Sequence, residues 1–375
     1  MDWLINTIHY VVPFLILLGV LVFVHELGHF IVARLCGVKV EVFSIGFGKE
    51  LWGFQDSQGT RWKISAVPLG GYCQFLGDED ASSTTSNADK LSEEDKKFAF
   101  EYQSPLKKLF IALAGPAANY LFAIVVFTLI FFFIGKVEFP PIVGEVVSGG
   151  AAERAGIKSG DRIIEINGHS ISTFDDIAKE TALSPKNHIN LVLTREGKQL
   201  SFSFDLLPVA DESSISGEEV RPMMGIRSVT ATEIMYKELN FTTSVKDAVL
   251  ETWRLTEMTL RGVGQMITGK RGAEDVGGIV RIAEMSGDIS KKSNFVDFLI
   301  FMALLSVNLG LINLFPIPVL DGGHVIIYVL EIITGKEMNA KIKDILFRFG
   351  LFLILALMIF ATYNDIVRLF KRWFA

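Results

Sequence analysis

Three polar residues interrupt an apolar stretch near the start of the chain. His25, Glu26 and His29 form the pattern His-Glu-x-x-His. On a helix, residues four apart share a face, so the two histidines can hold one metal ion, and zinc suits imidazole ligands. Glu26 is then placed to take a proton from a metal-activated water. Such a pattern also arises by chance in surface helices. A charged residue inside a membrane span, however, costs about 2.5–3.5 kcal/mol on insertion scales, which favours a metal site here.

A catalytic zinc site has three protein ligands and one open position. Asp321 is the predicted third ligand, because it ends the apolar run 298–320 at the same predicted depth as the histidines. The alternative is a helix-end residue in a Leu-Asp-Gly-Gly turn. Pro316 and Pro318 break the helix just before it, and membranes tolerate such breaks only where they are buried or line a watery cavity. His324 is a rival ligand, which we interpret as a supporting or structural residue.

The elements that must position these residues are membrane spans. Half of the 375 residues are hydrophobic and 21% are charged, and a span takes about 20 apolar residues. Four stretches satisfy this length, the last one when it extends back to Ile345 with Arg348 snorkelling. They are Trp3–Val24, Leu109–Gly135, Phe298–Leu320 and Phe349–Asn364.

Composition also excludes several classes of protein. High hydrophobicity with few charges excludes a disordered chain. With 36 basic and 42 acidic residues the net charge is −6, which argues against a nucleic-acid partner. Cys36 and Cys73 are the only cysteines, too few for a disulfide framework.

Basic residues predict the orientation of the spans. Arg34, Lys39, Lys107 and Lys108 flank the loop between the first two spans, and basic residues mark the cytoplasmic side. The N-terminus and the region 136–297 are therefore expected outside, although basic residues in the C-terminal tail oppose this assignment. A cleaved signal peptide fits poorly, because no basic residue precedes the first span.

The segments between the spans have a different pattern. Alternating apolar residues and glycines from Val38 to Leu76 predict β-hairpins, and an acidic, Ser- and Thr-rich stretch up to Lys97 predicts a flexible loop. In the outer insert, a glycine-punctuated run up to Gly168 is followed by two alternating runs. From Val245 to Ile267 apolar residues recur at helical spacing, which predicts an amphipathic helix.

Together these motifs resemble the site-2 protease family of intramembrane zinc metalloproteases. His-Glu-x-x-His lies in the first span, and Asn313 to Gly322 match Asn-x-x-Pro-x-Pro-x-x-Asp-Gly in a later one. Ala114 to Asn119 are similar to the family's small-residue motif in the second span. The resemblance covers nearly the whole chain and is nearest to the bacterial regulator-of-sigma-E proteases. The insert resembles a PDZ domain; the best-known members of that group carry two, whereas residues 141–208 account for one.

The resemblance implies a function and a site. It implies cleavage of single-span membrane substrates within the bilayer, such as anti-sigma factors or remnant signal peptides, in the bacterial inner membrane. It assigns one zinc ion per chain to His25, His29 and Asp321, and the role of general base to Glu26. It implies that Asn308 and Asn313 hold the substrate backbone near the scissile bond. An asparagine in a span more often makes a helix–helix hydrogen bond, and on that ground we leave Asn119 out of the site.

The predicted fold is a polytopic α-helical membrane protein with four transmembrane helices, a membrane-associated β-hairpin region and one extracytoplasmic (periplasmic) PDZ-like α+β domain. The site lies toward the cytoplasm. The PDZ-like domain either captures a peptide ligand or excludes bulky proteins by size. The predicted segments are helix 1 at 3–36, the β region and acidic loop at 37–106, helix 2 at 107–135, the PDZ-like domain at 141–208, an amphipathic helical region at 209–297, helix 3 at 298–326 and helix 4 at 345–366.

Two other functions compete with proteolysis. The first is a membrane-anchored PDZ adaptor with a non-catalytic metal site, although a structural zinc usually has four protein ligands and no catalytic carboxylate. The second is a metal transporter, which needs more polar residues along the spans than the sequence contains.

Overall fold

The computed structural model describes residues 2–78, 91–182, 188–210, 220–228, 235–268, 277–292 and 294–374. The chain divides into two compact units. The helical unit comprises Met1–Phe127, Ala248–Thr259 and Ala273–Ala375, and the insert unit comprises Thr128–Asp247 and Leu260–Gly272. Most of the predicted acidic loop, residues 79–90, lies outside the described residues.

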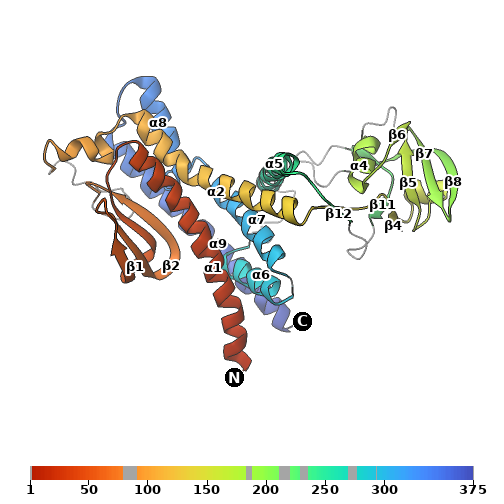
Figure 1. Ribbon diagram of the computed structural model, residues 1–375, viewed down its shortest axis with the longest axis horizontal. Helices are drawn as coiled ribbons and strands as arrows, with labels where there is room; N and C mark the ends of the chain where they lie inside the picture. Colours follow the sequence, from red (N-terminus) through yellow and green to blue (C-terminus); the bar gives the residue numbers. More distant parts are fainter. Residues whose placement is uncertain are drawn as a thin grey trace. The chain divides into compact units, whose positions relative to one another are not determined.

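Four of the described helices are long and apolar enough to cross a membrane, as the sequence predicts (Figure 1). A helix suits an apolar run in lipid because it satisfies its backbone hydrogen bonds within the segment. The last of the four exposes the most apolar surface, since only 6% of its most apolar window is buried. The qualifying segments are His9–Leu35 of α1 (Asp2–Leu35), Pro105–Phe133 (α2), Phe295–Asn313 (α7) and Lys341–Arg368 of α9 (Ala340–Phe374).

Small residues bring α1, α2 and α7 close together. A Cβ added to Gly28 of α1 would overlap the backbone of Ala114 in α2 and lie 2.7 Å from the Cβ of Ala118. A Cβ added to Gly310 of α7 would lie 3.0 Å from the Pro116 carbonyl oxygen of α2. Membrane helices associate through such close contacts because lipid gives them no hydrophobic reason to pair.

The third predicted segment, 298–326, is not one helix. Helix α7 ends at Asn313, and α8 (Asp321–Thr334) starts after a break that contains Pro316 and Pro318. Asp321 is therefore the first residue of a new helix rather than the end of a span. Prolines lack the N–H that would continue the helical ladder. The break is tightly packed: a Cβ added to Gly323 of α8 would lie 2.5 Å from the Cα of Pro318.

An antiparallel hairpin, β1 (Val40–Gln55) and β2 (Arg61–Phe75), packs beside α1 (Figure 1). The open end of the hairpin, where β1 begins and β2 ends, shares a buried hydrophobic cluster with Phe30 and Ala33 of α1. Its outer part instead exposes apolar side chains, with Trp52 60% exposed. Two short 3-10 helices, η2 (Asp95–Phe98) and η3 (Phe100–Tyr102), precede α2.

Helix α6 (Ile279–Lys292) ties together the helices at one end of the helical unit. One carboxylate oxygen of Asp365 in α9 accepts hydrogen bonds from the backbone N–H groups of Gly278 and Arg281, both at 3.1 Å. This places a buried negative charge at the N-terminus of α6, where the helix dipole favours it. On the other side, the Tyr10 hydroxyl of α1 donates to Asp288 of α6 at 3.2 Å.

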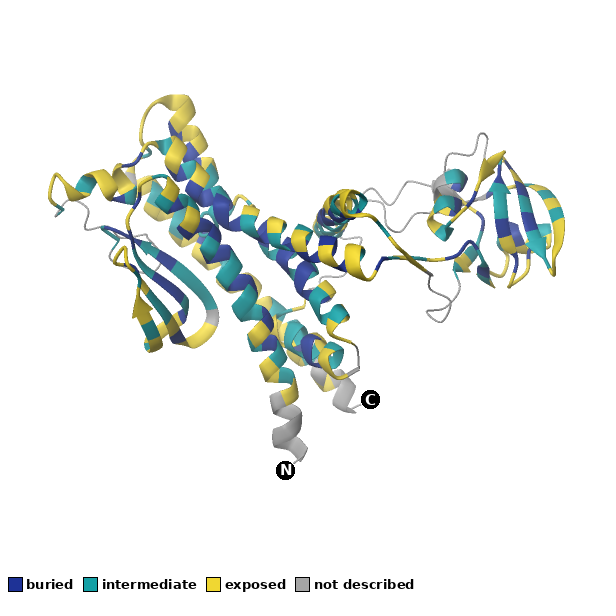
Figure 2. Cartoon of the chain, viewed as in Figure 1, coloured by how far each residue is buried: buried dark blue, intermediate teal, exposed yellow. Residues whose placement is uncertain are grey.

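The insert unit is built on a four-stranded antiparallel sheet in the order β6-β5-β7-β8. Buried and exposed residues alternate along β7, so Ile189, Leu191 and Leu193 face the core (Figure 2). The elements are β4 (Val143–Val146), α3 (Ala151–Ala155), β5 (Arg162–Ile166), β6 (His169–Ser170), α4 (Phe174–Ala182), β7 (His188–Arg195), β8 (Lys198–Asp205), β9 (Leu207–Ala210), β10 (Val220–Met223) and β11 (Ile226–Ser228).

The insert extends beyond the predicted 141–208. Strand β11 pairs with β4, and Met224 is buried in the same core as the sheet. The region 209–297 is also not purely helical. It contains β10, β11 and β12 (Met235–Lys237) before helices α5 (Phe241–Ile267) and α6. Strand β12 pairs with β3 (Lys136–Glu138), so two antiparallel strands lead into and out of the insert.

Candidate metal centre

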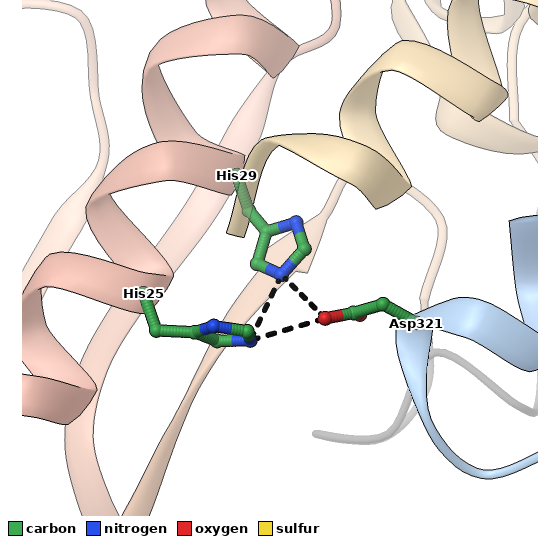
Figure 3. Close-up of side chains that lie close together, drawn as sticks. All are labelled: His25, His29 and Asp321. Carbon is green, nitrogen blue, oxygen red and sulfur yellow. Dashed lines mark hydrogen bonds and ion pairs between the residues drawn. The ribbon is translucent and has the colours of Figure 1, made fainter. Parts of the chain in front are cut away.

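Three side chains from distant parts of the sequence converge in the helical unit (Figure 3). His25 and His29 extend from consecutive turns of α1, and Asp321 extends from the first turn of α8. The two imidazole Nε2 atoms lie 3.3 Å apart. The Asp321 Oδ2 atom lies 3.1 Å from His25 Nε2 and 3.5 Å from His29 Nε2. These are the three residues that the sequence predicts as metal ligands, and the structure brings them together.

The arrangement fits a zinc ion. Two nitrogen or oxygen ligands of a tetrahedral zinc, each at about 2.0–2.1 Å, lie about 3.3 Å apart, and the three observed separations bracket this value. Asp321 Oδ2 is buried and faces the two imidazole Nε2 atoms. A buried carboxylate needs a compensating charge or hydrogen bond, and a cation between the three atoms would supply that charge.

Helix α2 orients both histidines. The Nδ1 atom of His29 lies 2.7 Å from the carbonyl oxygen of Ile111, so Nδ1–H donates and the Nε2 lone pair faces the other ligands. The Nδ1 atom of His25 lies 3.1 Å from the side-chain amide of Asn119. A ligand histidine commonly has its second nitrogen fixed in this way, which sets its tautomer.

A glycine of α2 leaves the room that the site needs. A Cβ added to Gly115 would overlap the Nε2 atom of His29 and lie 2.8 Å from a ring carbon of His25. Gly115 and Asn119 are four residues apart, so they share the face of α2 that points at the ligands.

Glu26 lies beside the three ligands in a pocket of about 240 Å³. It is 9% exposed. The thiol of Cys73 in β2 donates to the backbone carbonyl of Glu26 at 3.3 Å, which connects the hairpin to α1 at this point. The pocket also contains His324 and Tyr328 of α8. A pocket of this size holds several water molecules, each about 30 Å³. The arrangement therefore puts a carboxylate and three candidate metal ligands beside a cavity large enough for water.

The other candidate residues lie outside the group formed by His25, His29 and Asp321. His324 lines the pocket but is not in the ligand group found among the described residues. The side chain of Asn308 accepts a hydrogen bond at 2.8 Å from the hydroxyl of Thr259 in α5. Asn313 is the last residue of α7. Neither asparagine is among the residues that line the pocket.

Asn119 and Gly115 are the site residues that sequence reasoning missed. The signal was present, because both belong to the Ala114–Asn119 motif at a spacing that puts them on one helix face. What the sequence does not show is that this face of α2 points at His25 and His29 of α1 rather than at other residues.

Comparison with known proteins tests the family. The model of peptidase family M50 matches residues 13–357, which is most of the chain. The chain belongs to peptidase family M50. Relatives of this M50 peptidase align over nearly their whole lengths. A protein of Agrobacterium fabrum is 39% identical, with 95% of each chain covered. A protein of Rickettsia conorii is 39% identical, with 96% of this chain and 99% of the relative covered.

A third relative, from Rhizobium meliloti, is 38% identical over 99% of this M50 chain and 100% of its own. The names of all three describe them as zinc metalloproteases by inference. Family membership together with the four long apolar helices makes this M50 peptidase a multi-pass membrane protein.

Proposed function

We propose that this M50 peptidase is a zinc metalloprotease that hydrolyses a peptide bond inside the transmembrane helix of single-span membrane proteins. The observation that carries the proposal is the convergence of His25, His29 and Asp321 beside Glu26, on a helix apolar enough to span a membrane. The names of the relatives support zinc as the metal and proteolysis as the reaction. One ion per chain fits a single group of three ligands.

The chain's own residues account for the proton transfers. When bound, zinc supplies Lewis acidity, which polarises a scissile carbonyl and makes water more acidic. Glu26 takes a proton from the attacking water and then passes it to the nitrogen of the leaving amine. The α2 contacts keep the two imidazoles oriented while this happens. The pocket admits water, which hydrolysis consumes.

The substrate helix must unwind locally before cleavage, because a helical carbonyl is already hydrogen-bonded. Extended backbone can be stabilised by adding it to the edge of a sheet. The two-stranded β1–β2 hairpin supplies such an edge next to α1. By family resemblance, Asn308 and Asn313 hold the substrate backbone. For Asn308 this requires that the side chain exchange its bond to Thr259 for one to the substrate.

The proposal extends to the cell. We place the protein in a bacterial inner membrane with the metal centre toward the cytoplasm and the insert unit in the periplasm, as the basic residues near the first two spans indicate. The substrates are then anti-sigma factors or remnant signal peptides, cleaved in regulated intramembrane proteolysis. The insert, proposed as a PDZ-like domain, selects them by peptide capture or by size.

The experiment uses full-length protein purified in detergent, as wild type and as Glu26→Gln. Zinc is measured by elemental analysis, and cleavage of a tagged single-span helix is located by mass spectrometry. We expect about one zinc per chain in both proteins and cleavage within the apolar segment by wild type alone. Zinc in both proteins with cleavage by neither would favour the membrane-anchored adaptor. A wild-type protein without zinc would refute the proposal.

A further inference from the structure

The side chain of Asn119 is completely buried and only half satisfied. Its Nδ2 atom lies 3.1 Å from Nδ1 of His25, whereas its Oδ1 atom has no hydrogen-bond partner among the described residues. Its backbone carbonyl accepts a hydrogen bond from the hydroxyl of Ser306 in α7 at 2.9 Å, so α2 and α7 are joined at the same residue by a separate contact. A buried amide oxygen without a donor is destabilising.

The two orientations of this amide require two different tautomers of His25. If the amide N–H donates to Nδ1, then Nδ1 carries a lone pair and the ring proton is on Nε2, which faces His29 and Asp321. A protonated Nε2 cannot bind a metal. If the amide is rotated by 180°, its oxygen accepts Nδ1–H, and the lone pair is on Nε2. Only the second arrangement makes His25 a ligand.

We infer that Asn119 is a positioning residue for the metal site, whose amide oxygen accepts Nδ1–H of His25 when zinc is bound. The inference rests on the proposed zinc site. The rotated amide satisfies Oδ1 and fixes the ligand tautomer of His25. It gives His25 the same kind of partner that His29 has in the Ile111 carbonyl. Both ligand imidazoles are then oriented by α2, which itself contributes no ligand.

The same geometry couples metal binding to the orientation of the Asn119 side-chain amide. Nε2 of His25 lies 3.1 Å from a carboxylate oxygen of Asp321, and a proton on Nε2 would ease their approach. The Asn119 N–H group then faces the lone pair on Nδ1. With zinc bound in place of that proton, the rotated amide of Asn119 would accept from Nδ1–H of His25. Asn119 accommodates both arrangements by rotation of its amide.

The test compares three variants of the full-length protein by zinc affinity, measured by competition with a chelator. Asn119→Leu keeps the approximate size but removes both polar atoms. Asn119→Asp keeps an acceptor for Nδ1–H. Ser306→Ala is the matched control, because it removes the neighbouring buried hydrogen bond between α2 and α7 without touching His25. We expect Asn119→Leu to lower zinc affinity about 10–100-fold, and Asn119→Asp and Ser306→Ala to stay within a few-fold of wild type.

Two results would overturn the inference. One is wild-type zinc affinity in Asn119→Leu. The other is an equal loss in Ser306→Ala, which would mean that Asn119 acts only by packing the helices. If Asn119→Leu does not fold, Asn119→Asp decides: with a carboxylate as acceptor, a loss of affinity contradicts the proposed role. The measurement does not depend on proteolysis, so an absence of zinc from the wild type identifies a failure of the proposed function instead.

Discussion

Gly115 approaches the two ligand imidazoles more closely than a larger residue could. A Cβ at this position would overlap Nε2 of His29, the atom that would bind the metal. Moving the α2 backbone away would open its close packing against α1 at Gly28. The single missing methyl group is therefore a requirement of the site rather than of helix packing.

Gly115→Ala is expected to lower zinc affinity at least tenfold, because the new methyl displaces His29 from the ligand position. Gly19→Ala is the matched control: it makes the same change in α1, where an added Cβ meets no atom within 4 Å. Zinc content after dialysis against a weak chelator measures the effect. Equal zinc content in both variants would contradict this account.

At the scale of an element, the β1–β2 hairpin is anchored by one carboxylate at its turn. Asp56 accepts hydrogen bonds from the backbone N–H groups of Gln58 and Thr60, from the indole of Trp62 and from the guanidinium of Arg34 at the end of α1. Partial burial raises the pKa of Asp56, but the hydrogen bonds from Trp62, Arg34 and the turn outweigh it and lower the pKa from 3.8 to about 2.

The sign of the pH effect follows from that shift. Because the folded pKa lies below the unfolded one, the stabilisation is complete above about pH 4 and is lost as the pH falls toward 2. We expect the fluorescence of Trp62 to change in this acidic range. Asp56→Asn should remove that transition and leave the rest of the titration unchanged. Identical acid titrations of wild type and Asp56→Asn would exclude this role of Asp56.

Helix α6 depends in a similar way on one residue of α9. Asp365 is 1% exposed and caps the N-terminus of α6. Asp365→Ala should destabilise α6 by about 0.5–2 kcal/mol, as loss of a capping side chain does. Faster amide hydrogen exchange in 279–292 would show it. Asp344→Ala removes an exposed pair with Arg348 in the same helix and should leave exchange in α6 unchanged.

The membrane-spanning helices are the part of this fold that the sequence predicts, because each is a long apolar run. The four spans follow from length and hydrophobicity alone, and His25, His29 and Asp321 from residue type and spacing. The strands β10, β11 and β12 could not be foreseen, because strands of three or four residues carry no readable alternation and depend on distant partners such as β4. Asn119 illustrates the same limit: its residue type indicates a hydrogen bond, but only the packing of α2 on α1 shows that the partner is His25.

At the scale of the whole molecule, the metal centre joins two ends of the helical unit's sequence. Zinc would connect α1 to α8, so its binding free energy adds to the stability of the folded chain. Chelation of wild-type protein should lower its thermal unfolding midpoint, and added zinc should restore it. His29→Ala should start from the lower midpoint and respond to neither treatment. If chelation does not change the thermal unfolding midpoint of the wild type, zinc does not stabilise the connection between α1 and α8.

The separation of the ligands along the chain also has a consequence for biosynthesis. Asp321 follows His29 by 292 residues, which at about 5–20 residues per second takes about 15–60 s to translate. Until α8 has emerged and docked, the nascent protein has two histidines, Glu26 and no third ligand. On the proposed function, the zinc site stays incomplete without Asp321, so the protease would be inert while its own later helices enter the bilayer.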